Sequence, residues 1–471
     1  MKSFVPRRLH IMVCVIFFTA SLLPCAAFAE TCEQPIATAV SVEGNVEVQR
    51  AGETQWQTVS LDDTFCPGDT IRVDDQSRAA LSLANQPLLR LDQNTTLTLG
   101  GIEEKRGALV KLASGALHFF SRIRRNLEVQ TGFVNAGVEG TEGLIRVEKD
   151  RTLITIFDGQ VLASNAAGSL ALMGGQSAVA VAGKAPEGRV VARPRDAVHW
   201  ALYYPPVMLF APGKEPEEDS GDPHFLAYRA SRLLSVGRSD EAAADIQKAL
   251  SIDPKYSDAY ALQAVIFVVQ NEKEKALDSA KKAVETGPTS ATAQIALSYA
   301  RQASFDLEGA RASVEKAVNL DAFDALAWAR LAELWSSSGY LDKSLEAAKK
   351  AVEQDPDLAR TQMVLGFAYL TQVKTTESRA AFEKAIALDP ADPLSRLGLG
   401  LAKIRDGDLN AGGREIEIAA SLDPNNSIVR SYLGKTYFEE KKTGLDEREY
   451  AIAKQLDPKD PTPYFYDAIA K

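Results

Sequence analysis

The sequence predicts a multi-domain protein in which an all-β domain precedes an all-α superhelical solenoid. From residue 223 onward the chain repeats itself every 34 residues, and a fixed period of this length is typical of a stacked array of one supersecondary unit. Within residues 30–185, apolar residues instead recur at every second position, with Gly, Asn and Asp between the runs. This pattern indicates many short strands, as in a sandwich or a rolled solenoid, with helices nearly absent.

Composition places the chain among ordinary globular proteins and argues against one class of partner. Its 471 residues leave room for two or three domains, and 45% of them are hydrophobic and 25% charged. The formal net charge is −10, whereas non-specific nucleic-acid binding needs basic surface. We therefore expect no nucleic-acid partner.

Residues 1–29 have the three parts of a secretory signal peptide. Basic residues precede an apolar run at 11–23, and Ala27-Phe28-Ala29 has the small-x-small pattern of a cleavage site. The run is shorter than the roughly 20 residues of a membrane-spanning helix, and no later run is long and apolar enough. An uncleaved anchor is the alternative. The mature chain is expected to be periplasmic or extracellular and without an integral membrane span, and either soluble or bound to the envelope through partners.

Cysteine usage agrees with export. Of the four cysteines, only Cys32 and Cys66 lie after the signal peptide. In an oxidising compartment two cysteines are expected to form one disulfide, which stabilises by roughly 3–4 kcal/mol on the chain-entropy model. Two free buried thiols or a metal pair are the alternatives, although two ligands alone make no zinc site. We expect no metal and no cofactor.

The β region carries an ordered series of motifs. They include Gly44–Val48, Pro67–Val73, Ser77–Leu81, Gly137–Gly143 and Asp158–Val161. In this order they resemble the FecR domain, named after the ferric-citrate signalling regulator. In those regulators a cytoplasmic sigma-factor-binding segment and a membrane helix precede the domain, whereas a signal peptide stands in their place here. The resemblance implies an exported β module that contacts envelope components, and a FecR-type transmembrane signalling system is the alternative.

The strongest of these motifs contains two polar residues between glycines, Thr141 and Glu142. Two interpretations stay open for them. They can form a ligand site, or they can shape a tight turn, where glycine and small polar residues are common. The glycines do not form a dinucleotide-binding fingerprint, because no helical pattern follows them.

Residues 186–222 are predicted to link the two domains. The part from Asp196 to Pro206 is too aromatic for a free linker, so we expect it to dock on the β domain or on the first repeat. The part from Pro212 to Pro223 is acidic and rich in Pro and Gly, which is typical of a flexible hinge.

The repeating half keeps its register without an insertion. Each copy contains two apolar-periodic runs joined by a short polar turn, such as Ala325–Ser337 and Asp342–Gln354, which predicts an antiparallel helix pair. Asp-Pro or a related pair separates the copies, and an alanine lies five residues before it, where two helices are expected to approach closely. These alanines are Ala249, Ala283, Ala317, Ala351, Ala385, Ala419 and Ala453. The seven copies span 223–256, 257–290, 291–324, 325–358, 359–392, 393–426 and 427–460.

The repeat resembles the tetratricopeptide repeat (TPR) over about residues 223–471. The bulky fourth residue of that family appears as Leu226, Tyr260 and Trp328, and its aromatic eleventh residue as Trp335 and Tyr369, among others. The third copy departs from this pattern at Gln294 and Arg301 and is expected to pack less well than the others.

The TPR resemblance implies a partner-binding groove lined by the first helix of each copy. The groove residues that we single out are Val265, Val269, Tyr299, Glu333, Met363, Phe367, Leu401 and Lys435. Asn is missing from the groove positions, so the peptide-carboxylate ligand of better-known TPR grooves is not expected. The apolar mixture favours a protein partner that lays a peptide or helix in the groove, and burial between neighbouring copies is the alternative for each residue.

Residues 461–471 begin an eighth copy and stop inside its first helix. Either this half-repeat packs on the seventh copy as a lid, or the chain is a truncated form of a longer protein, and the abrupt stop favours truncation slightly.

Motifs of common enzyme classes are missing from the sequence: a phosphate-binding loop, HExxH, CxxC and GxSxG. We therefore expect a non-catalytic exported scaffold. Its array would bind a protein partner, while the β domain would contact an envelope component such as a glycan or an outer-membrane protein.

Overall fold

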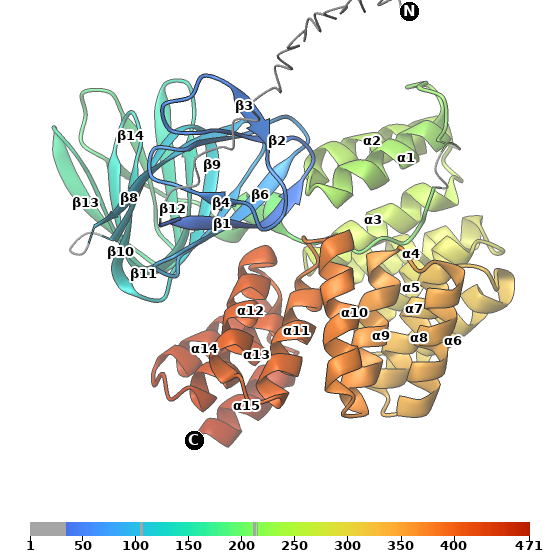
Figure 1. Ribbon diagram of the computed structural model, residues 1–471. Helices are drawn as coiled ribbons and strands as arrows, with labels where there is room; N and C mark the ends of the chain where they lie inside the picture. The colour runs from blue at the N-terminus through green and yellow to red at the C-terminus, as the bar shows by residue number, and fades with distance from the viewer. Residues whose placement is uncertain (1–33, 104–106, 211–212, 214) are drawn as a thin grey trace, which may run out of the picture. The chain divides into compact units, whose positions relative to one another are not determined.

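The computed structural model describes residues 34–103, 107–210, 213 and 215–471. The predicted signal peptide and Cys32 lie outside the described residues. Residues 34–471 form one compact unit, with strands in its first part and helices in its second (Figure 1). The predicted fold class is confirmed.

The strands of the β domain follow in chain order. They are β1 (Ala37–Glu43), β2 (Val46–Gln49), β3 (Trp56–Thr58), β4 (Thr64–Phe65), β5 (Thr70–Val73), β6 (Arg78–Leu83), β7 (Leu88–Leu91), β8 (Thr95–Glu103), β9 (Gly107–Phe120), β10 (Arg124–Gln130), β11 (Asn135–Val147), β12 (Arg151–Asn165), β13 (Gly168–Met173), β14 (Ser177–Val181) and β15 (Glu187–Arg189).

These strands form one hydrogen-bonded sheet that is folded over on itself. The long strands change partner along their length. β9 pairs with β8 and β10 in its first half, and with β7 and β11 over Gly115–Phe120. The inner face encloses one apolar core, with Phe65, Leu89, Phe119 and Ile156 among its fully buried members. Side chains on a strand point to the two faces of the sheet in turn, so apolar residues at every second position gather on one face and form this core.

β11 bends in the middle of the strongest FecR-like motif. Gly140 has φ +61°, and the register between β11 and β12 shifts from Glu139 to Glu142. A Cβ atom on the facing Gly159 would lie 2.8 Å from the Gly140 carbonyl oxygen, so this close approach requires glycine. Thr141 and Glu142 therefore lie in a bulge inside a strand, and the interpretation that they shape a tight turn is wrong.

The linker between the two domains begins later than the sequence predicted, because one more strand precedes it. β15 pairs with β14, so the sheet extends into the first residues of the predicted linker. A 3-10 helix, η1 (Pro194–Ala201), follows it. Val198 and Trp200 of η1 pack against Ala116 and Leu144 of the β domain. The aromatic part of the linker is thus docked, as its composition indicated.

The helical part consists of seven pairs and a final helix. They are α1 (Pro223–Ser235) and α2 (Ser239–Ile252), α3 (Ser257–Val269) and α4 (Lys273–Thr286), α5 (Ala291–Ala303) and α6 (Leu307–Leu320), α7 (Ala325–Ser337) and α8 (Leu341–Gln354), α9 (Ala359–Thr371) and α10 (Thr375–Leu388), α11 (Pro393–Arg405) and α12 (Leu409–Leu422), α13 (Ser427–Glu439) and α14 (Leu445–Leu456), and α15 (Thr462–Ala470).

Two recurring residue types explain the regularity of the pairs. All seven recurring alanines, from Ala249 to Ala453, have no exposed surface, because a larger side chain would separate the packed helices. The Asp of the turn between copies accepts a hydrogen bond from the backbone N–H two residues later. Asp253, Asp321, Asp355, Asp389 and Asp457 all do this. Asp321 keeps this Asx-turn although Ala322 replaces proline.

The third copy and the chain end differ in detail from the other copies. Gln294 is buried and its Nε2 has no hydrogen-bond partner, which agrees with poorer packing, whereas Arg301 donates to the Gly309 carbonyl and to Ser313. The final helix α15 packs on copy 7, with the Tyr466 ring 5.5 Å from that of Tyr432.

Candidate functional site

The first helices of the copies form the inner layer of the array. Contacts join α3 with α5, α5 with α7, α7 with α9, α9 with α11 and α11 with α13. The predicted groove residues all lie on these odd-numbered helices. Their role in binding a partner stays a prediction.

Burial divides the predicted groove into two parts. Val265, Tyr299 and Met363 are buried, and packing within the array accounts for them. Val269, Glu333, Phe367, Leu401 and Lys435 are half-buried. The last four occupy the same position in copies 4 to 7, and we call them the inner stripe.

A small hollow opens at one end of the inner stripe. It has a volume of about 190 Å³ and is lined by Ala332, Glu333, Ser336, Ser337, Ser344, Val364 and Phe367. The Phe367 ring forms the wall of this hollow and packs edge-on against Phe382, with ring centroids 4.9 Å apart. Phe367 is thus held in one orientation with part of its surface open.

A buried ionic network supports Glu333. Its carboxylate pairs with Arg330 at 2.8 Å and with Arg360 at 2.5 Å. Arg360 also donates to the Tyr299 hydroxyl at 3.0 Å, and the Arg330 guanidinium lies 3.8 Å from the Tyr299 ring centroid. Glu333 is therefore paired with two arginines, which neutralise its negative charge toward a ligand.

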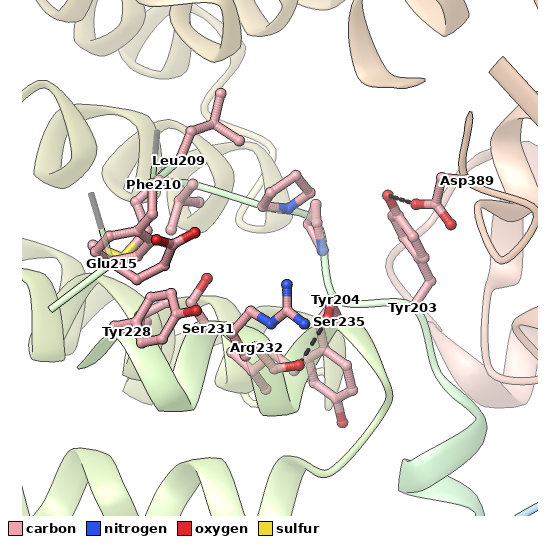
Figure 2. A pocket seen from close by; sticks show the side chains of 16 residues that line it. Tyr203, Tyr204, Leu209, Phe210, Glu215, Tyr228, Ser231, Arg232, Ser235 and Asp389 are labelled. Atoms are coloured by element: carbon pink, nitrogen blue, oxygen red, sulfur yellow. Dashed lines mark hydrogen bonds between the residues drawn. The ribbon is translucent and has the colours of Figure 1, made fainter. Parts of the chain in front are cut away.

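An extended segment of the linker crosses the array at the other end of the first helices. We call Leu202–Phe210 the strap, and it contains no helix or strand. Leu202, Tyr204 and Val207 are buried in the core of the array. Figure 2 shows the strap passing beside α1, with Tyr203 pointing to Asp389 on the far side. A hollow of about 270 Å³ remains between the strap and α1.

The strap brings the Tyr203 hydroxyl next to the carboxylates that precede α11. The Tyr203 hydroxyl donates to Asp389 at 3.1 Å. Burial and the carboxylates of Asp389 and Asp392 raise the pKa of Tyr203 well above its usual value, so the phenol stays protonated and remains a donor. Burial also raises the pKa of Asp392 to about 6, against the opposing effect of Arg360.

The β domain contacts the array through the same bulge that carries Glu142. Arg430 of α13 donates to Glu142 at 2.6 Å, and neither side chain has exposed surface. Arg430 also pairs with Glu449 of α14 at 3.2 Å, and Arg122 of the β domain pairs with Glu449 at 2.5 Å. We call Arg122, Glu142, Arg430 and Glu449 the interface cluster. Two carboxylates and two guanidinium groups thus alternate across the interface.

Neighbouring arginines and a histidine hydrogen bond decide the protonation state of Glu142. Burial alone raises its pKa, but Arg430, His118, Arg195 and Arg122 outweigh burial and hold the pKa well below the usual range of a glutamate. His118 Nε2 lies 3.5 Å from Glu142, and burial lowers the pKa of this imidazole. Glu142 is therefore a charged structural anchor, and the array fills the place that a ligand of this motif would need.

Further arginines of the array bind backbone groups of the β domain. Arg396 donates to the Val40 carbonyl at 2.9 Å, and Arg448 donates to the Gly140 carbonyl at 2.7 Å. In the opposite direction, Arg78 of β6 donates to the Trp200 and Leu202 carbonyls, each at 3.0 Å. Arg78 thus fixes the start of the strap.

Two copies of the array that are far apart in sequence, copies 2 and 7, also contact each other. Lys273 of copy 2 pairs with Asp457 of copy 7 at 2.8 Å, and the Asn271 side chain donates to the Leu456 carbonyl at 2.8 Å. The turn of the second helix pair therefore meets the end of the seventh pair.

Sequence reasoning missed the interface cluster, although one signal pointed to it. Copies 6 and 7 carry Arg396 and Arg430 at the fourth position, where the family favours a bulky apolar residue. Both arginines are buried and bonded to the β domain. An arginine at a core position of a repeat is expected to have a buried partner.

The disulfide, metal and membrane-span predictions are tested only in part. Cys32 lies outside the described residues, so its pairing with Cys66 stays a prediction. Within the described ranges, no three or more His, Cys, Asp or Glu side chains are grouped so that they could hold a metal ion. No helix in that part of the chain has the length and hydropathy of a bilayer-crossing segment.

Comparison with known protein families identifies both domains. Residues 69–162 match the family described as FecR protein. Residues 229–291 and 337–393 match the family described as tetratricopeptide repeat. No curated protein sequence matches the chain. The chain thus contains a FecR region followed by tetratricopeptide repeats, as the sequence motifs predicted.

Solved structures that are similar to the chain are TPR proteins. A thermophilic TPR protein of Thermus thermophilus has 21% identity and a TM-score of 0.35, with 38% of this chain and 98% of that chain covered. PilF of Pseudomonas aeruginosa has 18% identity and a TM-score of 0.33, with coverages of 46% and 98%. Human IFIT1 with PPP-AAAA has 18% identity and a TM-score of 0.43, and the match spans 55% of this chain and 64% of IFIT1. At these scores the likenesses say nothing about partners.

Proposed function

We propose that this FecR and TPR protein is a non-catalytic exported scaffold whose array binds a protein partner at the inner stripe. The observation that carries the proposal is the graded burial of the predicted groove. Four half-buried side chains repeat at one position in copies 4 to 7, while the groove residues of the earlier copies are mostly buried. Apolar Phe367 and Leu401 lie between Glu333 and Lys435, so the stripe fits an apolar helix or extended segment.

Site-specific photo-crosslinking in cells tests this proposal. A benzophenone side chain at Leu401 is expected to give a covalent adduct with a discrete envelope protein. The same group at Lys349, an exposed residue of α8, is the matched control and is expected to give none. Adducts at both positions, or at neither, would contradict binding at the inner stripe.

A second variant separates partner binding from folding. Phe367→Glu places a charge in the hollow and is expected to abolish the adduct at Leu401, because central apolar anchors contribute about 2–4 kcal/mol to binding. Its circular dichroism spectrum and thermal midpoint show whether the array is intact. An intact variant that still forms the adduct would refute the proposal.

The β domain is proposed to contact an envelope component away from the interface cluster. Residues 131–135, 164–167 and 182–183, at strand ends and in the turns that follow them, line a hollow of about 560 Å³. The lining includes polar side chains together with Phe133, a combination that suits a glycan or a polar protein loop. Asn135→Lys is expected to weaken retention of the protein on isolated envelopes, whereas Lys349→Glu on α8 should not change it.

A component of a FecR-type transmembrane signalling system is the second candidate, and the FecR family match favours it. Intact mass of the protein from cells separates the two. A mass that begins at Glu30 and increases by two hydrogens on reduction supports export and the Cys32–Cys66 disulfide. A full-length mass with Cys32 and Cys66 both free would favour the signalling role and contradict the exported scaffold.

A further inference from the structure

The turns between copies line a second, larger hollow on the array. Its volume is about 580 Å³, and it follows the turns that precede α5, α7 and α9. Its lining includes Leu209, Leu320, Asp321, Phe323, Asp324 and Asp355. We call it the turn groove. It contains no residue of the inner stripe and lies at the opposite end of the first helices.

Phe323 gives the turn groove an unusual apolar feature. Its side chain is 81% exposed, although burial of a phenylalanine side chain normally stabilises a protein. The equivalent turn residue in the other copies is polar or small: Lys255, Thr289, Asp357, Ala391, Asn425 and Lys459. The repeat pattern therefore does not require an aromatic residue here.

The turn holds Phe323 in place, and further apolar surface lies next to it. The Phe323 backbone N–H donates to the Asp321 carboxylate at 2.9 Å, which fixes the turn. Leu209 and Leu320, at 47% and 38% exposure, line the same groove. An exposed aromatic residue beside two exposed leucines is typical of a protein contact surface.

The charges of the turn groove have one sign. Asp321, Asp324 and Asp355 line it, and none of its lining residues is Lys or Arg. Each Asp uses its Oδ1 atom to accept backbone N–H bonds in its own turn or helix cap. The carboxylates are therefore fixed, and they favour cationic groups on whatever lies in the groove.

The strap shows what kind of chain this side of the array accepts. It is an extended segment whose apolar side chains pack on the array, and its Met208 and Leu209 form one wall of the turn groove. The groove thus continues an interface that already holds an extended polypeptide. We propose that the turn groove docks an extended segment of a protein partner, in which apolar side chains stand next to Lys or Arg.

Selection from a random peptide library tests this proposal on the full chain. The probe is a phage-displayed library of 12-residue peptides, and binding of the selected peptides is then measured by fluorescence anisotropy. Selected peptides are expected to combine apolar residues with Lys or Arg. Phe323→Ser should weaken their binding at least tenfold. Ile252→Ser removes an apolar side chain of 44% exposure on α2 and should leave binding unchanged.

A charge variant tests the partner chemistry separately. Asp355→Asn keeps the turn acceptor but removes one negative charge, and it should weaken binding of the selected peptides about threefold to tenfold, with a smaller effect in high salt. Asp357→Asn, outside the groove lining, is the control. Selected peptides that are neutral or acidic, or that bind Phe323→Ser as well as the wild type, would overturn the proposal. Self-association of the chain that depends on Phe323 would also overturn it, in favour of a second copy as occupant.

These outcomes are independent of the inner stripe. Phe367→Glu should leave binding of the selected peptides unchanged, because Phe367 and Phe323 line different hollows. Loss of binding in Phe367→Glu alone would assign the peptides to the inner stripe and overturn the turn groove as their site.

Discussion

Neutralising Glu142 should uncouple the β domain from the array. In Glu142→Gln, Arg430 keeps its van der Waals neighbours but loses the carboxylate that lies 2.6 Å away. Both side chains are fully buried, so water cannot replace the lost partner. The backbone of β11 is unchanged, and Gln has nearly the same volume as Glu.

The magnitude follows from burial and distance. Two unit charges about 4 Å apart interact by about 4 kcal/mol at an effective dielectric constant of about 20. Removal of one partner of a buried pair typically costs about 3–5 kcal/mol, because the other charge stays desolvated. We expect Glu142→Gln to lower the free energy of unfolding by about 3–4 kcal/mol, somewhat reduced because Glu449 also pairs with Arg430.

Equilibrium urea unfolding, followed by circular dichroism at a helical wavelength, measures this loss. A double-mutant cycle with Arg430→Met isolates the pair, and the double variant should be more stable than the sum of the single losses predicts. Lys435→Ala in the same helix is the control, since its surface pair with Glu439 contributes about 0.5 kcal/mol. A loss below about 1 kcal/mol in Glu142→Gln, or simple additivity in the double variant, would refute the role of the interface cluster.

Three further outcomes are expected. Asp392→Asn keeps the cap on α11 but removes a carboxyl group whose pKa in the folded protein is about 6. That pKa lies above the unfolded value of about 3.9. The stabilisation by protonated Asp392 is therefore present below about pH 4 and is lost as the pH rises through 6. The variant should therefore be about 2–3 kcal/mol more stable at pH 7 and show a flatter pH profile in thermal melts. Tyr203→Phe removes a hydroxyl bonded to half-buried Asp389 and should cost about 1–3 kcal/mol, seen as faster proteolysis within the strap; unchanged cleavage would argue against its anchoring role. Lys273→Ala should speed hydrogen exchange at the end of α14 and lower stability by about 1 kcal/mol, less in high salt, because its pair with Asp457 is partly exposed.

The sequence predicted the local structure of both domains well, because spacing encodes it. The fourth copy shows this: α7 spans Ala325–Ser337 as predicted, and α8 begins at Leu341, one residue before the expected Asp342. The two-residue alternation likewise predicted strands. Spacing within one sequence does not reveal how a strand folds over, so the bulge at Gly140 and the extra strand β15 were missed.

The candidate site was predicted only in part. The groove residues lie on the first helices of the copies, but the sequence did not show that the strap would cross the array near Arg360. Arg430 and Glu142 are separated by 288 residues, and no periodic pattern relates them. Contacts of this kind depend on how two complete domains pack, which the repeat register does not determine.

The contact between copies 2 and 7 has a consequence for how such a chain can change in evolution. Open solenoids gain and lose whole repeats easily, since each unit touches only its neighbours. Here Lys273 pairs with Asp457 across the array. The β domain also bonds to copy 1, where Arg238 pairs with Asp92 at 3.1 Å, and to copy 7 through Arg430. Inserting or deleting one 34-residue unit between copies 2 and 7 would prevent these three pairs from forming together. Duplication, the usual source of variation in these proteins, should therefore be selected against within this stretch.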